Sequence, residues 1–244
     1  MKRARGMLIS FGTLLAIGCG MNNYDYRIEQ TLERMKYERR LDENLMPEVK
    51  GRLEELGIYI RPPKNLAGPT QTFQFAAIEP GRFDLENTFL DADRQSLHIL
   101  ARVDLPKAAA KKGDPAQPEA PPRGDFNEEV IELIRNATGS EIDQAQFKEE
   151  TKQVRYRRVS NTFRTATVDR DPREMQVYLY GTKTSPQKVA LIFEYLKSDR
   201  NAVAPKIALT LENFLVGDAA RQAFSGGNED DIEAEGGGEA GPPI

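Results

Sequence analysis

The chain has 244 residues, of which 30% are charged and 39% hydrophobic, with one histidine, one cysteine and no tryptophan. This length allows one sizeable hydrophobic core, and a single cysteine excludes an intramolecular disulfide. The formal net charge is -4, so no chain-wide basic field points to nucleic acid as a partner. The acidity is concentrated near the C-terminus, which carries six carboxylates and no cation: Glu229, Asp230, Asp231, Glu233, Glu235 and Glu239.

The N-terminus has the three-part layout of an export signal. A positive region comes first, and it consists of Lys2, Arg3 and Arg5. An apolar run follows over residues 7–17, and the small residue Gly18 then precedes Cys19. This run is too short to cross a bilayer as a helix, which takes about 20 residues. We therefore predict that residues 1–18 are a signal peptide.

The segment Ala16-Ile17-Gly18-Cys19 resembles the lipobox of bacterial lipoproteins, Leu-Ala/Ser-Gly/Ala-Cys, and departs from it at Ala16. The resemblance implies cleavage before Cys19, a diacylglycerol on its sulfur, and an acyl chain such as palmitate on its amine. Each buried methylene contributes about 0.8 kcal/mol, and one chain alone holds only marginally, so a Cys19 with two or three chains would be stably anchored. The alternative is an ordinary signal peptide beside an incidental cysteine.

The family's sorting rule bears on which membrane the anchor would enter. Gly20 and Met21 are not the acidic pair that retains some lipoproteins at the inner membrane. The resemblance therefore favours the outer membrane, at its periplasmic face or at the cell surface.

Residues 19–46 are predicted to form a lipidated cysteine followed by a tether helix. Apolar side chains recur at helical spacing in this polar stretch: Ile28, Leu32, Met35, Leu41 and Leu45. Such a helix would span roughly 30 Å at 1.5 Å per residue. The alternative is that its narrow apolar seam packs on the domain or on a second copy of the chain.

Residues 47–224 are predicted to form a single α+β domain. A short helix should begin at Pro47 and end at Gly57, and a strand should follow over residues 58–60. Period-two alternation of apolar residues predicts strands at 70–78, 83–89 and 97–105, the last two adjacent in a half-buried antiparallel sheet.

The middle of this domain is interrupted by residues 106–124, a proline- and alanine-rich stretch that we interpret as a flexible, exposed insertion. Asp125 then has the position of a helix N-cap, with Glu128 as its capping-box partner, and Gly139 should end this helix.

The C-terminal half is predicted to be rich in strands, centred on residues 154–157, 163–167, 175–179 and 189–193. The last of these is almost continuously apolar, as in a strand buried on both faces. A final helix should begin at Pro205 and end at Gly217, and residues 225–244 are predicted to form a disordered acidic tail.

These elements define the predicted fold class. It is α+β, with a largely antiparallel sheet and covering helices, preceded by the tether helix and followed by the acidic tail. The element order from Ile58 to Gly217 resembles the PsbP-like fold. That resemblance implies a non-catalytic envelope or assembly accessory, and it carries over no site residues.

The chain offers few residues for catalysis or metal binding. His98 is the only histidine, and we expect it to be exposed or held by structural contacts, because its strand neighbours occupy the core face. Asp91/Asp93 and Asp169/Asp171 have a spacing that suits a hard cation, but turn carboxylates explain both pairs more simply. There is no zinc, calcium or phosphate-loop motif. We therefore predict no catalytic residues, no metal and no cofactor.

One group of cations is a candidate contact with an anionic surface. Arg155, Arg157 and Arg164 are expected on adjacent strands, where they would share one exposed face. Such a face suits anionic lipid headgroups, an acidic cell-wall polymer or the protein's own acidic tail. The alternative is an ordinary solvated face of the sheet.

The sequence thus favours a lipid-anchored cell-envelope protein that acts as a non-catalytic interaction or structural module. Its expected partners are the membrane, through the anchor, and an envelope protein or cell-wall polymer, with no nucleic acid. One alternative is a small-ligand-binding or assembly-accessory protein of the PsbP-like type. Another is a cell-wall carbohydrate hydrolase that uses two carboxylates.

Overall fold

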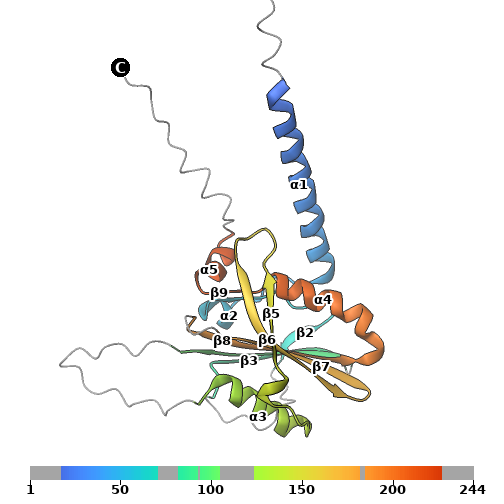
Figure 1. Ribbon diagram of the computed structural model, residues 1–244, viewed down its shortest axis with the longest axis vertical. Helices are drawn as coiled ribbons and strands as arrows, with labels where there is room; N and C mark the ends of the chain where they lie inside the picture. The colour runs from blue at the N-terminus through green and yellow to red at the C-terminus, as the bar shows by residue number, and fades with distance from the viewer. Residues whose placement is uncertain (1–17, 71–81, 93, 105–123, 182–184, 227–244) are drawn as a thin grey trace, which may run out of the picture. The chain divides into compact units, whose positions relative to one another are not determined.

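The computed structural model describes residues 18–70, 82–92, 94–104, 124–181 and 185–226 (Figure 1). The chain divides into two compact units, residues 1–43 and 44–244, and each is described by itself. The predicted signal peptide, the strand at 70–78, the insertion and the acidic tail fall wholly or almost wholly outside the described residues.

The described part of the first unit lies in helix α1, Gly18–Asn44, so the helix predicted within residues 19–46 is confirmed. Arg34 donates a hydrogen bond to Glu38 one turn on, at 3.1 Å, as the charge spacing predicts. Ile28, Leu32 and Met35 lie at the surface. Leu41 and Leu45, which belong to the same predicted seam, are buried. The seam is therefore exposed over its first three residues and buried only over its last two.

The second unit is built on a seven-stranded sheet in which every strand pair is antiparallel. The strand order is β2-β3-β4-β8-β7-β6-β5. The strands are β2 Ala67–Thr70, β3 Leu85–Asp91, β4 Gln95–Val103, β5 Lys148–Gln153, β6 Ser160–Arg170, β7 Arg173–Tyr180 and β8 Gln187–Leu196. The predicted α+β class with a largely antiparallel sheet is confirmed.

Helices cover both faces of this sheet (Figure 1). Helix α4, Arg200–Glu212, packs through Val203, Ile207 and Leu211 on the face that carries Leu97 and Phe193. Helix α3, Phe126–Thr138, packs on the opposite face. Its buried side chains there are Phe126, Val130, Ile131, Leu133 and Ile134.

The central strands are consequently buried on both sides. In β8 this was predicted from its apolar run, and it is confirmed. For β4 the sequence predicts one solvated face, because polar residues alternate there with apolar ones. The structure corrects that expectation: Ser96, His98 and Arg102 are buried, because α3 lies over the face that they occupy.

Helix α3 follows its sequence signals closely. The Asp125 side chain accepts a hydrogen bond from the backbone N–H of Glu128, and Gly139 ends the helix in the left-handed conformation, at φ 65°. The Glu128 carboxylate accepts from the side chain of Gln144, which begins the short 3-10 helix η1, Gln144–Gln146.

The C-terminal helix differs from its prediction. Pro205 does not begin α4 but lies inside it, five residues after Arg200, with the 3-10 helix η2, Lys197–Asp199, directly before. Because Pro205 is the sixth residue of α4 and has no N–H group, the helix lacks one backbone hydrogen bond, the one to the carbonyl four residues earlier. The helix ends at Glu212, ahead of the predicted stop at Gly217.

The residues between Glu212 and Gly217 join a small second sheet instead. Strand β9, Leu215–Val216, pairs with β1, Ile58–Tyr59. Helix α2, Arg52–Glu55, is shorter than predicted, because the backbone N–H groups of Met46 and Val49 bond to the carbonyls of Pro62 and Ile60 in extended chain. An unpredicted helix α5, Asp218–Phe224, follows Gly217.

The strand predicted at residues 154–157 is wrong. These residues form the turn of the β5–β6 hairpin, closed by a hydrogen bond from Val154 N–H to the carbonyl of Val159. The preceding strand β5, Lys148–Gln153, has no apolar residue and so gives no hydrophobic signal.

Candidate functional site

The predicted lipidation residue, Cys19, is the second residue of α1. Among the described residues, no helix is both long and apolar enough to span a membrane.

Helix α1 carries a stripe of exposed large apolar side chains, here called the α1 stripe: Tyr24, Ile28, Leu32 and Met35. Their spacings of four, four and three residues place them along one side of the helix. In the described part of the chain, the only other exposed large hydrophobic side chains are Tyr26 and Tyr156. Apolar surface that is concentrated in this way marks an interaction site more often than scattered exposed residues do.

The β5–β6 hairpin ends in a turn that carries three arginines and a tyrosine, here called the basic tip: Arg155, Tyr156, Arg157 and Arg158. Arg155 and Arg158 are exposed, and Arg157 is half-buried. Tyr156 has φ 60°, which is uncommon for a bulky residue, and its ring lies 5.5 Å from the Arg155 guanidinium carbon. The chain thus concentrates positive charge at the end of the hairpin.

Arg164 lies apart from the basic tip. It belongs to the middle of β6, where it is paired with Glu149, while the tip lies beyond the last pair of the hairpin, Gln153 with Ser160. Its guanidinium lies 5.6 Å from the centre of the Phe147 ring and donates to the carbonyl of Gln144 at 3.1 Å. The structure therefore brings Arg155 and Arg157 together but not Arg164, because the first two are turn residues. Anionic contact at these residues stays a prediction.

His98 is almost completely buried, on the face of the sheet that α3 covers. Its Nδ1 lies 3.0 Å from the Thr88 hydroxyl on β3, directly across the strand pair. Burial lowers the pKa of His98 from 6.5 to about 4, so the ring is neutral at physiological pH. Its contacts are those of a structural residue, and it lies away from solvent.

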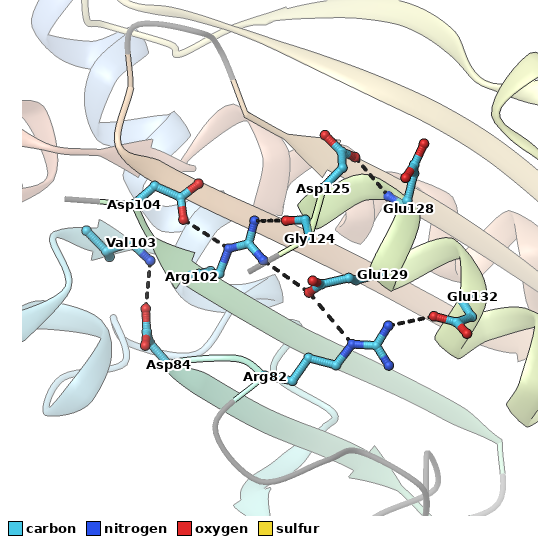
Figure 2. A network of polar contacts seen from close by, with 10 residues as sticks. All are labelled: Arg82, Asp84, Arg102, Val103, Asp104, Gly124, Asp125, Glu128, Glu129 and Glu132. Atoms are coloured by element: carbon cyan, nitrogen blue, oxygen red, sulfur yellow. Dashed lines mark hydrogen bonds and ion pairs between the residues drawn. The ribbon is translucent and has the colours of Figure 1, made fainter. Parts of the chain in front are cut away.

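A charged network joins the end of β4 to the start of α3 (Figure 2). At its centre, the Arg102 guanidinium donates to Glu129 Oε2 at 3.0 Å and to the carbonyl of Gly124 at 2.9 Å. It also forms an ion pair with Asp104 at 3.0 Å. The Arg102 side chain is only 4% exposed, so these groups replace the water that the charge has lost.

This network fixes both ends of the segment between β4 and α3. Asp104 is the last described residue before the predicted insertion, and Gly124, the final residue of that insertion, is the next described one. Arg82 extends the network through Glu129, at 3.7 Å, and Glu132, at 2.7 Å. Arg82, Asp104 and Gly124 therefore belong to one network around a buried arginine, a relation that the sequence alone did not indicate.

A second polar network lies on the opposite face of the sheet. The Tyr195 hydroxyl donates to Glu174 at 2.5 Å and accepts from the Gln176 side chain at 2.7 Å, while Tyr178 donates to Gln176 at 2.9 Å. Burial, followed by the charges of nearby carboxylates, raises the pKa of Tyr178 to about 12. Arg200 lies 3.6 Å from the free oxygen of Glu174. Both phenols are thus held neutral and act as structural hydrogen-bond donors.

The candidate cation ligands Asp169 and Asp171 both bind a protein cation. Lys197 Nζ lies 2.5 Å from Asp169 and 3.2 Å from Asp171. Asp93 lies outside the described residues, and Asp91 accepts from the Asn65 side chain at 2.9 Å. In the part of the chain that the structure describes, no group of three or more metal-ligating side chains comes together.

No protein-family model and no curated protein sequence matches the chain. Among solved structures, it is similar to cyanobacterial PsbP (CyanoP) from Synechocystis sp. PCC 6803, with 11% identity, a TM-score of 0.40, and coverage of 71% of this chain and 93% of that one. It is also similar to the Ran-binding protein Mog1p of Saccharomyces cerevisiae, with 9% identity, a TM-score of 0.36, and coverage of 72% and 98%.

PsbP is the fold family that the predicted element order resembles, and a PsbP structure is among those found. At these identities and TM-scores, the similarity concerns the course of the chain alone. The structure itself defines an α+β protein with a seven-stranded antiparallel sheet between helices.

The buried position of His98 predicts a specific dependence of stability on pH. Its pKa is lower in the folded state than the usual 6.5, so the unfolded chain binds more protons between about pH 6.5 and 4. The free energy of unfolding should therefore fall as the pH decreases through this window, by roughly 3 kcal/mol in total at 1.36 kcal/mol per pKa unit. Urea unfolding of the protein and of His98→Gln, which lacks this titration, measures the difference.

The same pKa is directly observable by NMR, because the chain has only one histidine. The His98 ring signals should titrate with a midpoint near 4. A midpoint between 6 and 7 would contradict the buried placement.

The Arg102 network predicts an unequal response to two matched substitutions. Arg102→Met leaves Glu129 largely buried without its closest cation and should lower the free energy of unfolding by about 3–5 kcal/mol. Arg82→Met removes the same charge from the more exposed end of the network and should cost about 1 kcal/mol or less. Urea unfolding at neutral pH compares them. An equal loss of unfolding free energy in the two variants would show that Arg102 does not hold the network. If Arg102→Met does not fold, Arg102→Lys provides a milder variant for the same comparison.

Proposed function

We propose that this protein is a lipid-anchored cell-envelope protein that acts as a non-catalytic interaction module. The observation that carries the proposal is the continuity of the N-terminal region. Gly18 and Cys19, the last two residues of the lipobox-like segment, are the first two residues of α1, which is 27 residues long. At 1.5 Å per residue this helix is about 40 Å long, which suits a spacer between lipid and domain.

The chemistry of the described residues supports a binding role over a catalytic one. The only histidine is buried and neutral, and the phenols of Tyr178 and Tyr195 are held by hydrogen bonds. Glu194 on β8 lies between two arginines, at 3.2 Å from Arg170 and 3.8 Å from Arg173. Groups held in this way stabilise a fold, whereas a general acid or base needs access to a substrate.

The α1 stripe is the surface that we assign to partner binding. Tyr24, Leu32 and Met35 are each at least half exposed, at 65%, 50% and 57%. An apolar helix face of this kind suits the hydrophobic groove of another envelope protein, which would bind it through residues three and four positions apart.

The anchor is tested by the chemistry of the native N-terminus. Protein purified from the source membranes should begin at Cys19 and carry the mass of a diacylglycerol and an acyl chain, because the lipobox resemblance implies both. Cys19→Ser should move the protein to the soluble fraction, since the acyl chains supply the membrane affinity. Met21→Ala, next to the motif, should leave both properties unchanged. A native product that begins at Met1, or at an unmodified Cys19, would refute the anchor.

The interaction role is tested by photo-crosslinking in intact cells. A photo-reactive amino acid at position 32, in the α1 stripe, should give a discrete adduct with an envelope component. The same residue at position 33, which points about 100° away around the helix, should give little or none. Adducts of equal yield at both positions, or no adduct at position 32, would contradict a specific contact.

A further inference from the structure

The basic tip lies beside the last described helix of the chain, α5 (Figure 1). Val154, at the base of the tip, is buried in one cluster with Leu215 and Ala220, and Ala223 packs against the same cluster. The hairpin end and α5 therefore share an apolar contact, which fixes their relative position.

The end of α5 lies at the same cluster as the base of the tip, where Tyr59, Val159 and Ala223 pack around Val154. Phe224, the last residue of α5, packs edge-on against Tyr59, with 5.1 Å between ring centres. Burial raises the pKa of Tyr59, and the charges of Arg61 and, to a smaller degree, Arg157 oppose that rise. Arg157 is thus within electrostatic reach of the ring that Phe224 contacts.

The sequence that follows α5 is complementary in charge to the basic tip. Residues 229–239 carry six carboxylates and no cation, while residues 155–158 carry three arginines and no carboxylate. Glu229 is five residues after Phe224, and a chain of five residues spans at most about 17 Å. Because the acidic segment is attached beside the tip, its effective concentration there is in the millimolar range.

We propose that the acidic segment 229–239 docks on the basic tip of its own chain. A single exposed ion pair contributes little, about 0.2–1 kcal/mol, so the contact depends on several pairs formed together. It is therefore weakened by salt, which screens exposed charges beyond about 10 Å at 0.1 M. The segment occupies the tip and withholds its arginines from other polyanions. This inference goes beyond the proposed function and does not depend on the lipid anchor.

A spin label on the acidic segment tests the contact. In the full-length chain with Cys19→Ser and Ala234→Cys, a nitroxide at position 234 should broaden the NMR amide signals of residues 155–158. The broadening should fall on the order of threefold between low salt and 0.5 M NaCl, because the attraction is screened. It should also fall when Arg155→Gln and Arg158→Gln remove two charges from the tip.

The matched control is Lys148→Gln with Arg164→Gln, which removes two charges from the same hairpin away from the tip. This control should leave the broadening of residues 155–158 unchanged. Broadening that persists in the tip variant, or that falls equally in the control, would overturn the proposal. So would broadening of a spin-free, isotope-labelled chain mixed with a separate spin-labelled one, which would place the segment on a second copy.

A last comparison separates the acidic segment from lipid as the occupant of the tip. Tip amides that show no broadening from position 234, but shift when phosphatidylglycerol vesicles are added, would make the tip a lipid contact and refute the intramolecular one. If the segment docks, the spin label at position 234 should broaden the tip amide signals, and vesicles should not shift those signals in the chain with its full acidic segment. The vesicles should produce shifts only after four of the six carboxylates are removed by Glu229→Gln, Asp230→Asn, Asp231→Asn and Glu233→Gln.

Discussion

Burial of both faces of the central strands β4 and β8 is the constraint on which the rest of the structure depends. An antiparallel sheet with one solvated face tolerates any polar residue there, whereas a sheet between two helical layers does not. Helix α4 covers one face and α3 the other, so the two apolar clusters meet only through the sheet itself. A buried polar side chain on these strands is therefore costly unless a partner replaces the water that it has lost.

The matched partners explain the polar networks. His98 faces Thr88, Arg102 faces Glu129 from the covering helix, and Glu194 faces Arg170. A buried ion pair seldom adds much stability relative to apolar residues of the same size, but the loss of one partner is costly. The contact between Arg102 and Glu129 therefore specifies how α3 sits on the sheet more than it strengthens it.

The sequence predicts the fold class, α1, α3 and the central strands, because their apolar periodicity and caps are local signals. It fails where a tertiary contact decides the outcome. Lys148–Gln153 forms an edge strand through backbone pairing alone, and residues 154–157 alternate like a strand but make a turn. The burial of β4 depends on the packing of α3 against the sheet, and no local sequence pattern predicts that packing. For the candidate site, the arginines were identified but their grouping was not, because it depends on that turn.

The composition of the outer strands has a consequence for how the molecule behaves among its own copies. One border of the sheet is β5, with the sequence Lys-Glu-Glu-Thr-Lys-Gln, and the other is β2, which contains Gly68 and Pro69. Charged side chains and proline both hinder the addition of a foreign strand to an open border. The sheet therefore resists polymerisation through its backbone, even where many copies are crowded on one surface.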